Sequence, residues 1–246
     1  MSDIVKVSEE GPVTVIQINR PDKGNAISRQ VAIDLQAAFA AFDASDQRVA
    51  VLTSAGDKHF SAGADVTDLP ELWRCVPTLG IATEKPVIAA TTGWVVGGAV
   101  VIVMMADLCI ASETTKFSYP EAKLGFTGGA IAGLAARIPH KIAMEMIMMG
   151  RPMTAERAWQ AGFVNKVVPV GQHIAEAVAW GQELAGYAPL VLKTIKRFVV
   201  QSVLPRGPSE LMALAQQDLA AVRESEDGAE GRAAFKEKRK PNFKGR

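Results

Sequence analysis

The chain has 246 residues, with 27 basic and 26 acidic side chains and 48% hydrophobic residues. At roughly 150 residues per domain, this length allows one domain or two. The 22% of charged residues and the mean hydropathy of +0.12 exclude a wholly disordered chain. The net charge of +1 gives no reason to expect a nucleic acid or a membrane as partner. The longest apolar stretch, residues 95–106, is too short to span a bilayer.

The cysteines and the first residues of the chain bear on its compartment. Cys75 and Cys109 lie far apart, without a Cys-x-x-Cys pair or a histidine at ligand spacing. We therefore expect neither a disulfide framework nor a metal site. The opening residues lack the basic and apolar pattern of a secretory signal. Together these features predict a cytoplasmic protein.

In the first half of the chain, short apolar runs alternate with apolar residues at helical spacing. Ser28 can cap a helix whose apolar residues run from Val31 to Phe42. The segment His59–Lys85, rich in Gly, Asp and Pro, is expected to be a functional loop, and so is Phe117–Thr127. The expected strands are Val13–Ile18, Val49–Thr53, Val87–Thr91 and Leu108–Ala111, and the expected helices are Ser28–Asp43 and Ala99–Met105.

The second half of the sequence predicts seven helices and a single strand. This pattern indicates an α/β core over residues 1–172, followed by a C-terminal helical region over residues 173–246. The last 15 residues carry seven basic side chains and one acid, Glu237. Such a tail is either a solvated end or a site for phosphate groups. The strand is expected at Val164–Val168 and the helices at Gly128–Arg137, Ile142–Met149, Thr154–Ala161, Ile174–Gly186, Leu190–Val203, Ser209–Glu224 and Ala229–Phe235.

Three segments, in this order, carry a family resemblance. His59–Asp65 reads HFSAGAD, Pro86–Ala99 contains PVIAA and GWVVGGA, and Phe117–Gly125 reads FSYPEAKLG. Together they resemble the crotonase superfamily, the enoyl-CoA hydratase/isomerase group, and the C-terminal Ala234–Lys244 matches as well. The resemblance implies an α/β fold with a crotonase-like (ClpP/crotonase) ββα spiral core and a C-terminal helical trimerisation region. It also implies a homotrimer or a dimer of trimers.

The small residues of the first two segments suit an oxyanion hole. An acyl thioester becomes acidic at its α-carbon only when negative charge on its carbonyl oxygen is stabilised, and two fixed backbone N–H groups do this well. Gly and Ala, as in Ala62–Ala64 and Gly97–Gly98, let the backbone approach a ligand closely. A helix beginning at Gly98 would add the positive end of its dipole. By resemblance, the N–H groups of Ala64 and Gly98 form the oxyanion hole.

Glu121 is the expected acid–base residue. It follows Pro120 in a loop flanked by apolar residues, where partial desolvation would raise the pKa of the Glu121 carboxyl group. By resemblance, typical hydratases carry a second glutamate three residues after the oxyanion-hole glycine, where this chain has Val101. Moving a proton between C2 and C4 of an enoyl thioester needs only one carboxylate. The resemblance therefore favours an isomerase of the Δ3,Δ2-enoyl-CoA type.

Other activities stay open at this point. A 2-enoyl-CoA hydratase is possible if another group replaces the missing acid, and Asp68, Glu71 and Tyr119 are candidates. A CoA-thioester hydrolase and a weakly catalytic acyl-CoA binding protein are two further alternatives. The three histidines have no acid or cysteine partner at a telling spacing, so we expect them to be structural or solvent-facing.

Coenzyme A is expected as part of the acyl-CoA substrate, without a separate cofactor. By resemblance, the turn at Lys23 and Gly24 and the backbone of Ala62 lie near the adenine, and Asp65 belongs to the same binding motif. The resemblance also implies that two residues of the basic tail, on the same or a neighbouring subunit, close over the nucleotide: Phe235 and Lys238.

The acyl-chain cover is expected to be small. The stretch between Asp65 and Lys85 is shorter than is usual in the resembling family. We expect Leu69, Leu72 and Trp73 to line what is left of the acyl pocket.

Overall fold

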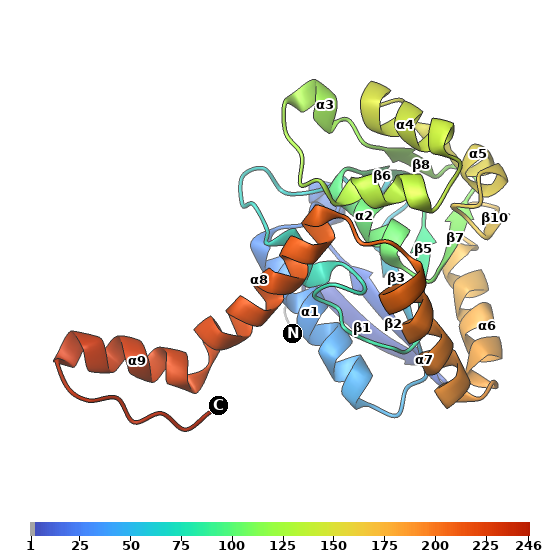
Figure 1. Ribbon diagram of the computed structural model, residues 1–246. Coiled ribbons are helices and arrows are strands. Elements are labelled where there is room, and N and C mark those ends of the chain that lie inside the picture. The colour runs from blue at the N-terminus through green and yellow to red at the C-terminus, as the bar shows by residue number, and fades with distance from the viewer. Residues whose placement is uncertain (1–2) are drawn as a thin grey trace.

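The computed structural model describes residues 3–246. Its centre is a six-stranded sheet in the order β1-β2-β3-β5-β7-β10, drawn in Figure 1. β1 pairs antiparallel with β2, and all other neighbours in this sheet are parallel. The strands of this sheet are β1 (Val5–Glu10), β2 (Val13–Ile18), β3 (Val49–Ser54), β5 (Val87–Thr91), β7 (Leu108–Ser112) and β10 (Lys166–Val168).

Both faces of this sheet are covered, because successive residues of a strand point to opposite sides. On one face, Val13, Val49 and Ile88 form a cluster with residues of α6 (His173–Ala185). Residues of the other face, such as Leu52 and Ala89, belong to a larger cluster. That cluster also holds the apolar residues of α1 (Arg29–Ala44) and α2 (Gly98–Met105). Burial on two faces explains the continuous apolar runs in the sequence.

A second, four-stranded sheet stands beside the first, in the order β4-β6-β8-β9. β3 leads into β4, β5 leads into β6 and then α2, and β7 leads into β8 and then α3 (Glu121–Leu124). Each of these turns passes from the first sheet to the second, which is the predicted ββα spiral. The strands of this sheet are β4 (His59–Ser61), β6 (Trp94–Val96), β8 (Lys116–Ser118) and β9 (Met153–Thr154).

The C-terminal region is helical, as predicted. α6 nevertheless packs on the central sheet, so it is part of the core although it lies beyond residue 172; the domain boundary itself stays a prediction. α8 leads away from the body and α9 projects beyond it as an arm (Figure 1). This region contains α7 (Pro189–Phe198), the π-helical turn η4 (Val199–Val203), α8 (Pro208–Glu224) and α9 (Glu226–Glu237). Within residues 3–246, no helix has the length and apolarity that crossing a membrane requires.

Helices such as α1 and α5 begin at a side-chain cap, and the one at Ser28 was predicted. The Ser28 hydroxyl accepts a hydrogen bond of 3.3 Å from the Val31 N–H at the start of α1. The Thr154 hydroxyl accepts one of 3.3 Å from the Arg157 N–H at the start of α5. Short elements complete the fold: η1 (Pro21–Lys23), η2 (Leu72–Cys75), η3 (Ala130–Ala136), α4 (His140–Met149) and α5 (Ala155–Gln160).

Several sequence-based assignments were wrong. The segment Phe117–Thr127 is not a loop throughout, because it holds the end of β8 and all of α3. The expected helix Gly128–Arg137 is a 3-10 turn, with Gly133 inside it lowering helix propensity. The expected helix Leu190–Val203 is α-helical only as far as Phe198. Five of the described strands were missed: β1 has one buried residue in six, and β4, β6, β8 and β9 have only two or three residues each.

Candidate active site

Two turns of small residues meet at the N-terminus of α2. Gly63 has a φ of 93°, and a Cβ atom on it would stand 2.9 Å from the carbonyl oxygen of Val96. Gly97 has a φ of 58° and a ψ of −122°, which side chains disfavour. These glycines let the turn after β4 lie against the turn after β6. Ala64 and Gly98, the next residues along each turn, therefore belong to adjoining backbone segments.

The fold leaves both of the predicted oxyanion amides without a partner. Within residues 3–246, the N–H groups of Ala64 and Gly98 donate no hydrogen bond to another protein atom. Their neighbours do, because Asp65 donates to the Ile27 carbonyl and Gly97 to the Ser118 carbonyl, each at 2.9 Å. Gly98 also begins α2, so its N–H belongs to the unpaired, electropositive first turn. An oxyanion role for the two amides requires this freedom, and the role itself stays a prediction.

Glu121 brings a carboxylate to the same place. It is the first residue of α3 and is 8% exposed. Its Oε1 atom lies 2.5 Å from the point where a Cβ atom would stand on Gly97, and no described residue hydrogen-bonds its buried Oε2 atom. Burial raises the pKa of Glu121 to about 7, because a poorly solvated carboxyl group favours its neutral form. Such a group can both accept and donate a proton near neutral pH.

Two of the three candidate second acids are committed to ion pairs. The Asp68 carboxylate accepts from the Arg29 N–H at 3.2 Å and lies 3.7 Å from the Arg29 guanidinium. Glu71 pairs with Arg74 at 2.9 Å and with Arg223 at 3.6 Å. Neither of them offers a free carboxylate beside Glu121.

The third candidate is Tyr119, two residues before Glu121 in the sequence. Its hydroxyl is 2.9 Å from the Thr127 hydroxyl. Burial raises the pKa of Tyr119, and the charge of Glu121 adds to this effect. Val101, at the position where typical hydratases have an acid, is 3% exposed and packs in the core. Of the three candidates, only the phenol hydroxyl of Tyr119 is not held in an ion pair with a described residue.

The residues predicted near the adenine come together at the end of β4. The Ala62 N–H donates to the Gly24 carbonyl at 2.8 Å. Gly24 has a φ of 58° and follows Lys23, the last residue of η1. A Cβ on Gly24 would stand 3.3 Å from the Ala62 side chain and 3.6 Å from the His59 ring. The structure thus brings Lys23, Gly24 and Ala62 together, and their contact with a nucleotide stays a prediction.

Asp65 has a structural task in this turn. Its carboxylate accepts from the Thr67 hydroxyl at 2.6 Å and from both terminal nitrogens of Arg20 at 3.2 Å. The Thr67 hydrogen bonds, together with Arg20, lower the pKa of Asp65. Arg20 also donates to the Ala26 carbonyl at 2.7 Å. The Asp65 carboxylate therefore fixes the oxyanion turn, and a part in coenzyme A binding stays a prediction.

The last two predicted residues lie on the arm. Phe235 is 89% exposed in α9, and Lys238 ends that helix with a φ of 54°. α9 projects away from the body of its own chain (Figure 1). A role of these two residues in nucleotide binding fits the site of another chain, and it stays a prediction.

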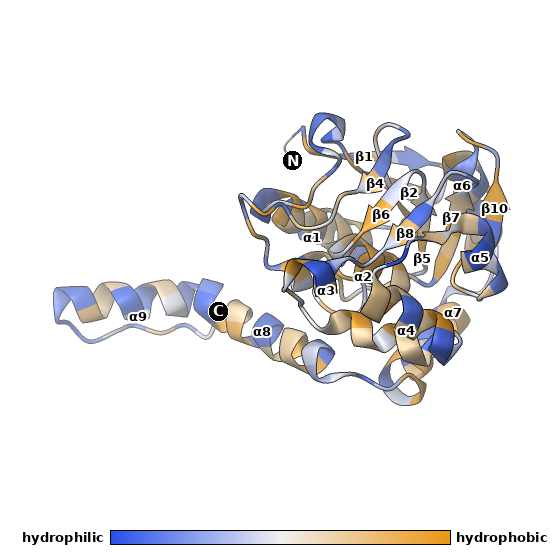
Figure 2. Ribbon diagram, turned by 90° about the horizontal axis from the view of Figure 1, so that it is seen from above, coloured by the Kyte–Doolittle hydropathy of each residue, from blue (hydrophilic) through white to orange (hydrophobic). Residues whose placement is uncertain are grey.

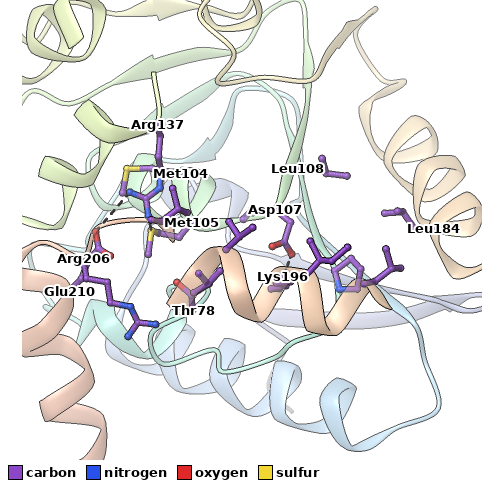
Figure 3. Close-up of a pocket in the computed structure, with 17 residues that line it drawn as sticks. Thr78, Met104, Met105, Asp107, Leu108, Arg137, Leu184, Lys196, Arg206 and Glu210 are labelled. Atoms are coloured by element: carbon purple, nitrogen blue, oxygen red, sulfur yellow. Dashed lines mark hydrogen bonds and ion pairs between the residues drawn. The ribbon is translucent and has the colours of Figure 1, made fainter. Parts of the chain in front are cut away.

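A separate cavity of about 420 Å³ lies at the opposite end of α2 (Figure 3). Its walls come from the end of α2, from α7 with η4, and from the start of α8. The buried Glu210 lies 3.9 Å from Arg137 on one side, and Lys196 pairs with Asp107 at 2.7 Å on another. None of the predicted site residues lines this cavity.

Other reactive side chains of the described part of the chain do not form a second centre. No group of three or more His, Cys, Asp or Glu side chains there is placed to hold a metal ion. Cys75 and Cys109 are buried, and burial raises the pKa of each thiol to about 12. Such thiols carry almost no thiolate at neutral pH.

The sequence did not predict two contacts that shape this site. Gly97 admits the Glu121 carboxylate, and Arg20 holds Asp65. The Gly-Gly pair at residues 97 and 98 was a visible signal for the first contact, whereas Arg20 and Asp65 are 45 positions apart and no local pattern links them.

Comparison with known proteins decides the family. The chain matches the family model of enoyl-CoA hydratase/isomerase over residues 8–246. It belongs to the enoyl-CoA hydratase/isomerase family. A carnitinyl-CoA dehydratase of Salmonella typhi is 35% identical over 262 positions, which cover 100% of both chains.

Solved structures agree with this assignment. The crystal structure of a carnitinyl-CoA hydratase from Mycobacterium avium has 31% identity and a TM-score of 0.76. That of an enoyl-CoA hydratase from Mycobacterium tuberculosis has 30% identity and a TM-score of 0.76. Both comparisons cover 100% of each chain. The predicted family and the predicted crotonase fold are confirmed, and the protein is an enzyme of this family.

Proposed function

We propose that this enzyme moves a proton at C2 of an acyl-CoA thioester. Glu121 acts first as base and then as acid, while the N–H groups of Ala64 and Gly98 hold the enolate oxygen. The observation that carries the proposal is the Glu121 carboxylate, with its pKa near 7, against Gly97 in the turn that presents the Gly98 amide. Coenzyme A enters as part of the substrate, so the reaction needs no separate cofactor.

Isomerisation of a 3-enoyl thioester is the reaction that one carboxylate can complete. Glu121 takes a proton from C2, and the electron pair of that bond moves into the conjugated system and onto the carbonyl oxygen. The two amides stabilise this charge, and loss of one such donor costs about 10²–10³ in rate. The protonated Glu121 then gives the proton to C4, and a double bond is left between C2 and C3.

The names of the relatives favour a second candidate, the addition or removal of water. In the removal of water from a 3-hydroxyacyl thioester, Glu121 would take the C2 proton. The C3 hydroxide would then leave with that same proton as water. A single carboxylate can serve both steps only if both groups lie on its side. In the reverse reaction Glu121 would take a proton from the attacking water and then give it to C2, and Tyr119 is a candidate for a second polar group beside it.

Two substrates distinguish the candidates. The purified protein is incubated with 3-butenoyl-CoA and, separately, with crotonyl-CoA, and the absorbance of the conjugated enoyl thioester is followed. Isomerisation predicts a gain of absorbance with the first substrate and little change with the second. A faster loss with crotonyl-CoA would reject isomerisation in favour of hydration.

Substitution of the carboxylate tests the remaining alternatives. Glu121→Gln should abolish proton transfer while the affinity for the acyl-CoA stays within a few fold of the wild type. Release of free thiol by the wild type would indicate a thioester hydrolase. Full turnover by Glu121→Gln would overturn the assignment of the base.

We also propose that the chain assembles as a homotrimer or a dimer of trimers. α7 has no buried residue, although several of its exposed side chains are apolar, and Figure 2 shows apolar stretches on the outside of α7 and α8. Light scattering should give three or six times the chain mass of 26.2 kDa, and a monomer would contradict the proposal. The exposed apolar residues that support it are Leu190, Val191, Ile195, Phe198, Leu211, Met212, Leu219 and Val222.

A further inference from the structure

The side chain of Leu72 fills the space in front of Gly98. A Cβ atom on Gly98 would stand 2.6 Å from Cδ2 and 3.1 Å from Cδ1 of Leu72. Leu72 lies in η2, is half-buried and packs against the main core cluster. In the proposed function, the thioester carbonyl binds the N–H of this same Gly98. The leucine methyl groups therefore stand beside the first carbons of the acyl chain.

Arg74 fixes the segment that carries this leucine. It is 9% exposed, and its guanidinium lies 4.7 Å from the centre of the Trp73 ring. It donates to Glu71 at 2.9 Å, to Gln36 of α1 at 2.9 Å and to Glu224, the last residue of α8. Three acceptors from three parts of the chain hold the planar guanidinium in one orientation.

A tight turn after η2 adds to this rigidity. The Gly80 N–H donates to the Trp73 carbonyl at 2.9 Å, and its own carbonyl accepts from Gln36 at 3.2 Å. A Cβ on Gly80 would overlap the backbone of Arg74. Thr78 has a φ of 66°, a strained conformation for a β-branched residue. Such strain persists only where the surroundings over-determine the backbone, so the segment cannot move freely away from Gly98.

We propose that Leu72 sets the upper length of the acyl chain and that Arg74 is the positioning residue that holds Leu72 in place. The substrate class that follows is a short acyl-CoA thioester, with an acyl group of about the size of butyryl. This inference rests on the proposed function for the place of the thioester carbonyl.

Binding of saturated acyl-CoA molecules tests the inference without turnover. Butyryl-CoA and octanoyl-CoA are titrated calorimetrically into the full chain, with coenzyme A as the reference. The wild type should bind butyryl-CoA more tightly. Leu72→Ala should shift the affinity ratio toward octanoyl-CoA on the order of tenfold, since each newly buried methylene contributes a factor of about four. Val170→Ala, in an exposed loop before α6, should leave the ratio unchanged.

The role of Arg74 needs a second pair of variants. Arg74→Lys should shift the ratio in the same direction by less, and should add nothing in the Leu72→Ala background. Glu224→Gln, which removes one partner, replaces Arg74→Lys if that variant does not fold. A lower melting temperature with an unchanged ratio would make Arg74 merely structural and would reject its positioning role.

The two proposals fail in different ways. Equal binding of both acyl-CoA molecules by the wild type, or an unchanged ratio in Leu72→Ala, would overturn the chain-length inference alone. If the wild type binds neither thioester more tightly than coenzyme A, both the chain-length inference and the proposed function are wrong.

Discussion

The Oε1 atom of Glu121 lies 2.5 Å from the point where a Cβ atom would stand on Gly97. The place of the carboxylate thus depends on the absence of a side chain at one position of a turn. The same turn presents the N–H of Gly98. One glycine therefore serves both the proposed base and the proposed oxyanion hole.

Gly97→Ala should lower kcat, whereas a control variant with a similar loss of stability should not. The new methyl group would displace the Glu121 carboxylate, and a shift of about 1 Å at a reacting group can cost about a hundredfold in rate. The matched control is Gly162→Ala, because Gly162 has a φ of 74° and a Cβ atom on it would have no neighbour within 4 Å. Both variants should lose melting temperature, and only Gly97→Ala should lose kcat. Wild-type kcat in Gly97→Ala would contradict the contact.

The pH dependence of kcat/KM should report Glu121. The carboxylate form removes the C2 proton, and burial raises the pKa of Glu121 to about 7. The rate with a 3-enoyl-CoA should therefore rise with pH and level off above about pH 7. The measurement is a series of initial rates from about pH 5 to about pH 9. A flat profile over this range would mean that another group is the base.

Glu121→Gln should also change the pH dependence of stability. The folded protein holds the Glu121 proton with a pKa of about 7, against the ordinary 4.5. The folded state therefore binds more protons between these values, and wild-type stability falls as the pH rises from about 4.5 to about 7. Glutamine does not titrate. The free energy of unfolding of the variant, relative to that of the wild type, should therefore rise by up to about 3 kcal/mol from acid to neutral pH. Denaturant unfolding of both proteins at each pH measures this difference, and parallel curves would contradict it.

Asp65→Asn should weaken the oxyanion turn. The hydrogen bonds of Thr67 and Arg20 lower the folded-state pKa of Asp65 below its ordinary 3.8. The stabilisation by this carboxylate is complete above pH 3.8, and it is lost as the pH falls through the lowered pKa of the folded state. The variant should melt below the wild type at neutral pH, and the gap should close in strong acid. Asp57→Asn, which removes a carboxylate without a described ion pair, is the control, and an equal effect there would reject the assignment.

The sequence predicted those parts of the fold whose signal is local. Val49–Ser54 is buried on both faces and is visible as an apolar run, and the Ser28 cap marks its helix. Val5–Glu10 was missed, because an exposed edge strand has no such run. Small residues and a Pro-Glu pair, together with the family resemblance, were enough to select Ala64, Gly98 and Glu121 as candidates.

The contacts that the sequence did not predict join residues that lie far apart in the chain. Arg74 and Glu224 are 150 positions apart, and nothing in the sequence around either residue indicates that they meet. The contact of Leu72 with Gly98 likewise depends on how the segment folds back over itself. Local patterns cannot predict such contacts, since they arise only when the chain is packed.

Ala64, Gly98 and Glu121 each stand a few residues after a strand of the four-stranded sheet, namely β4, β6 and β8. Each of these strands has three residues, and they pair with one another rather than with sequence neighbours. No fragment that ends before residue 121 could assemble the three groups. In rising urea, turnover should therefore vanish together with the far-ultraviolet circular dichroism, so that enzyme assays serve as a probe of cooperative unfolding.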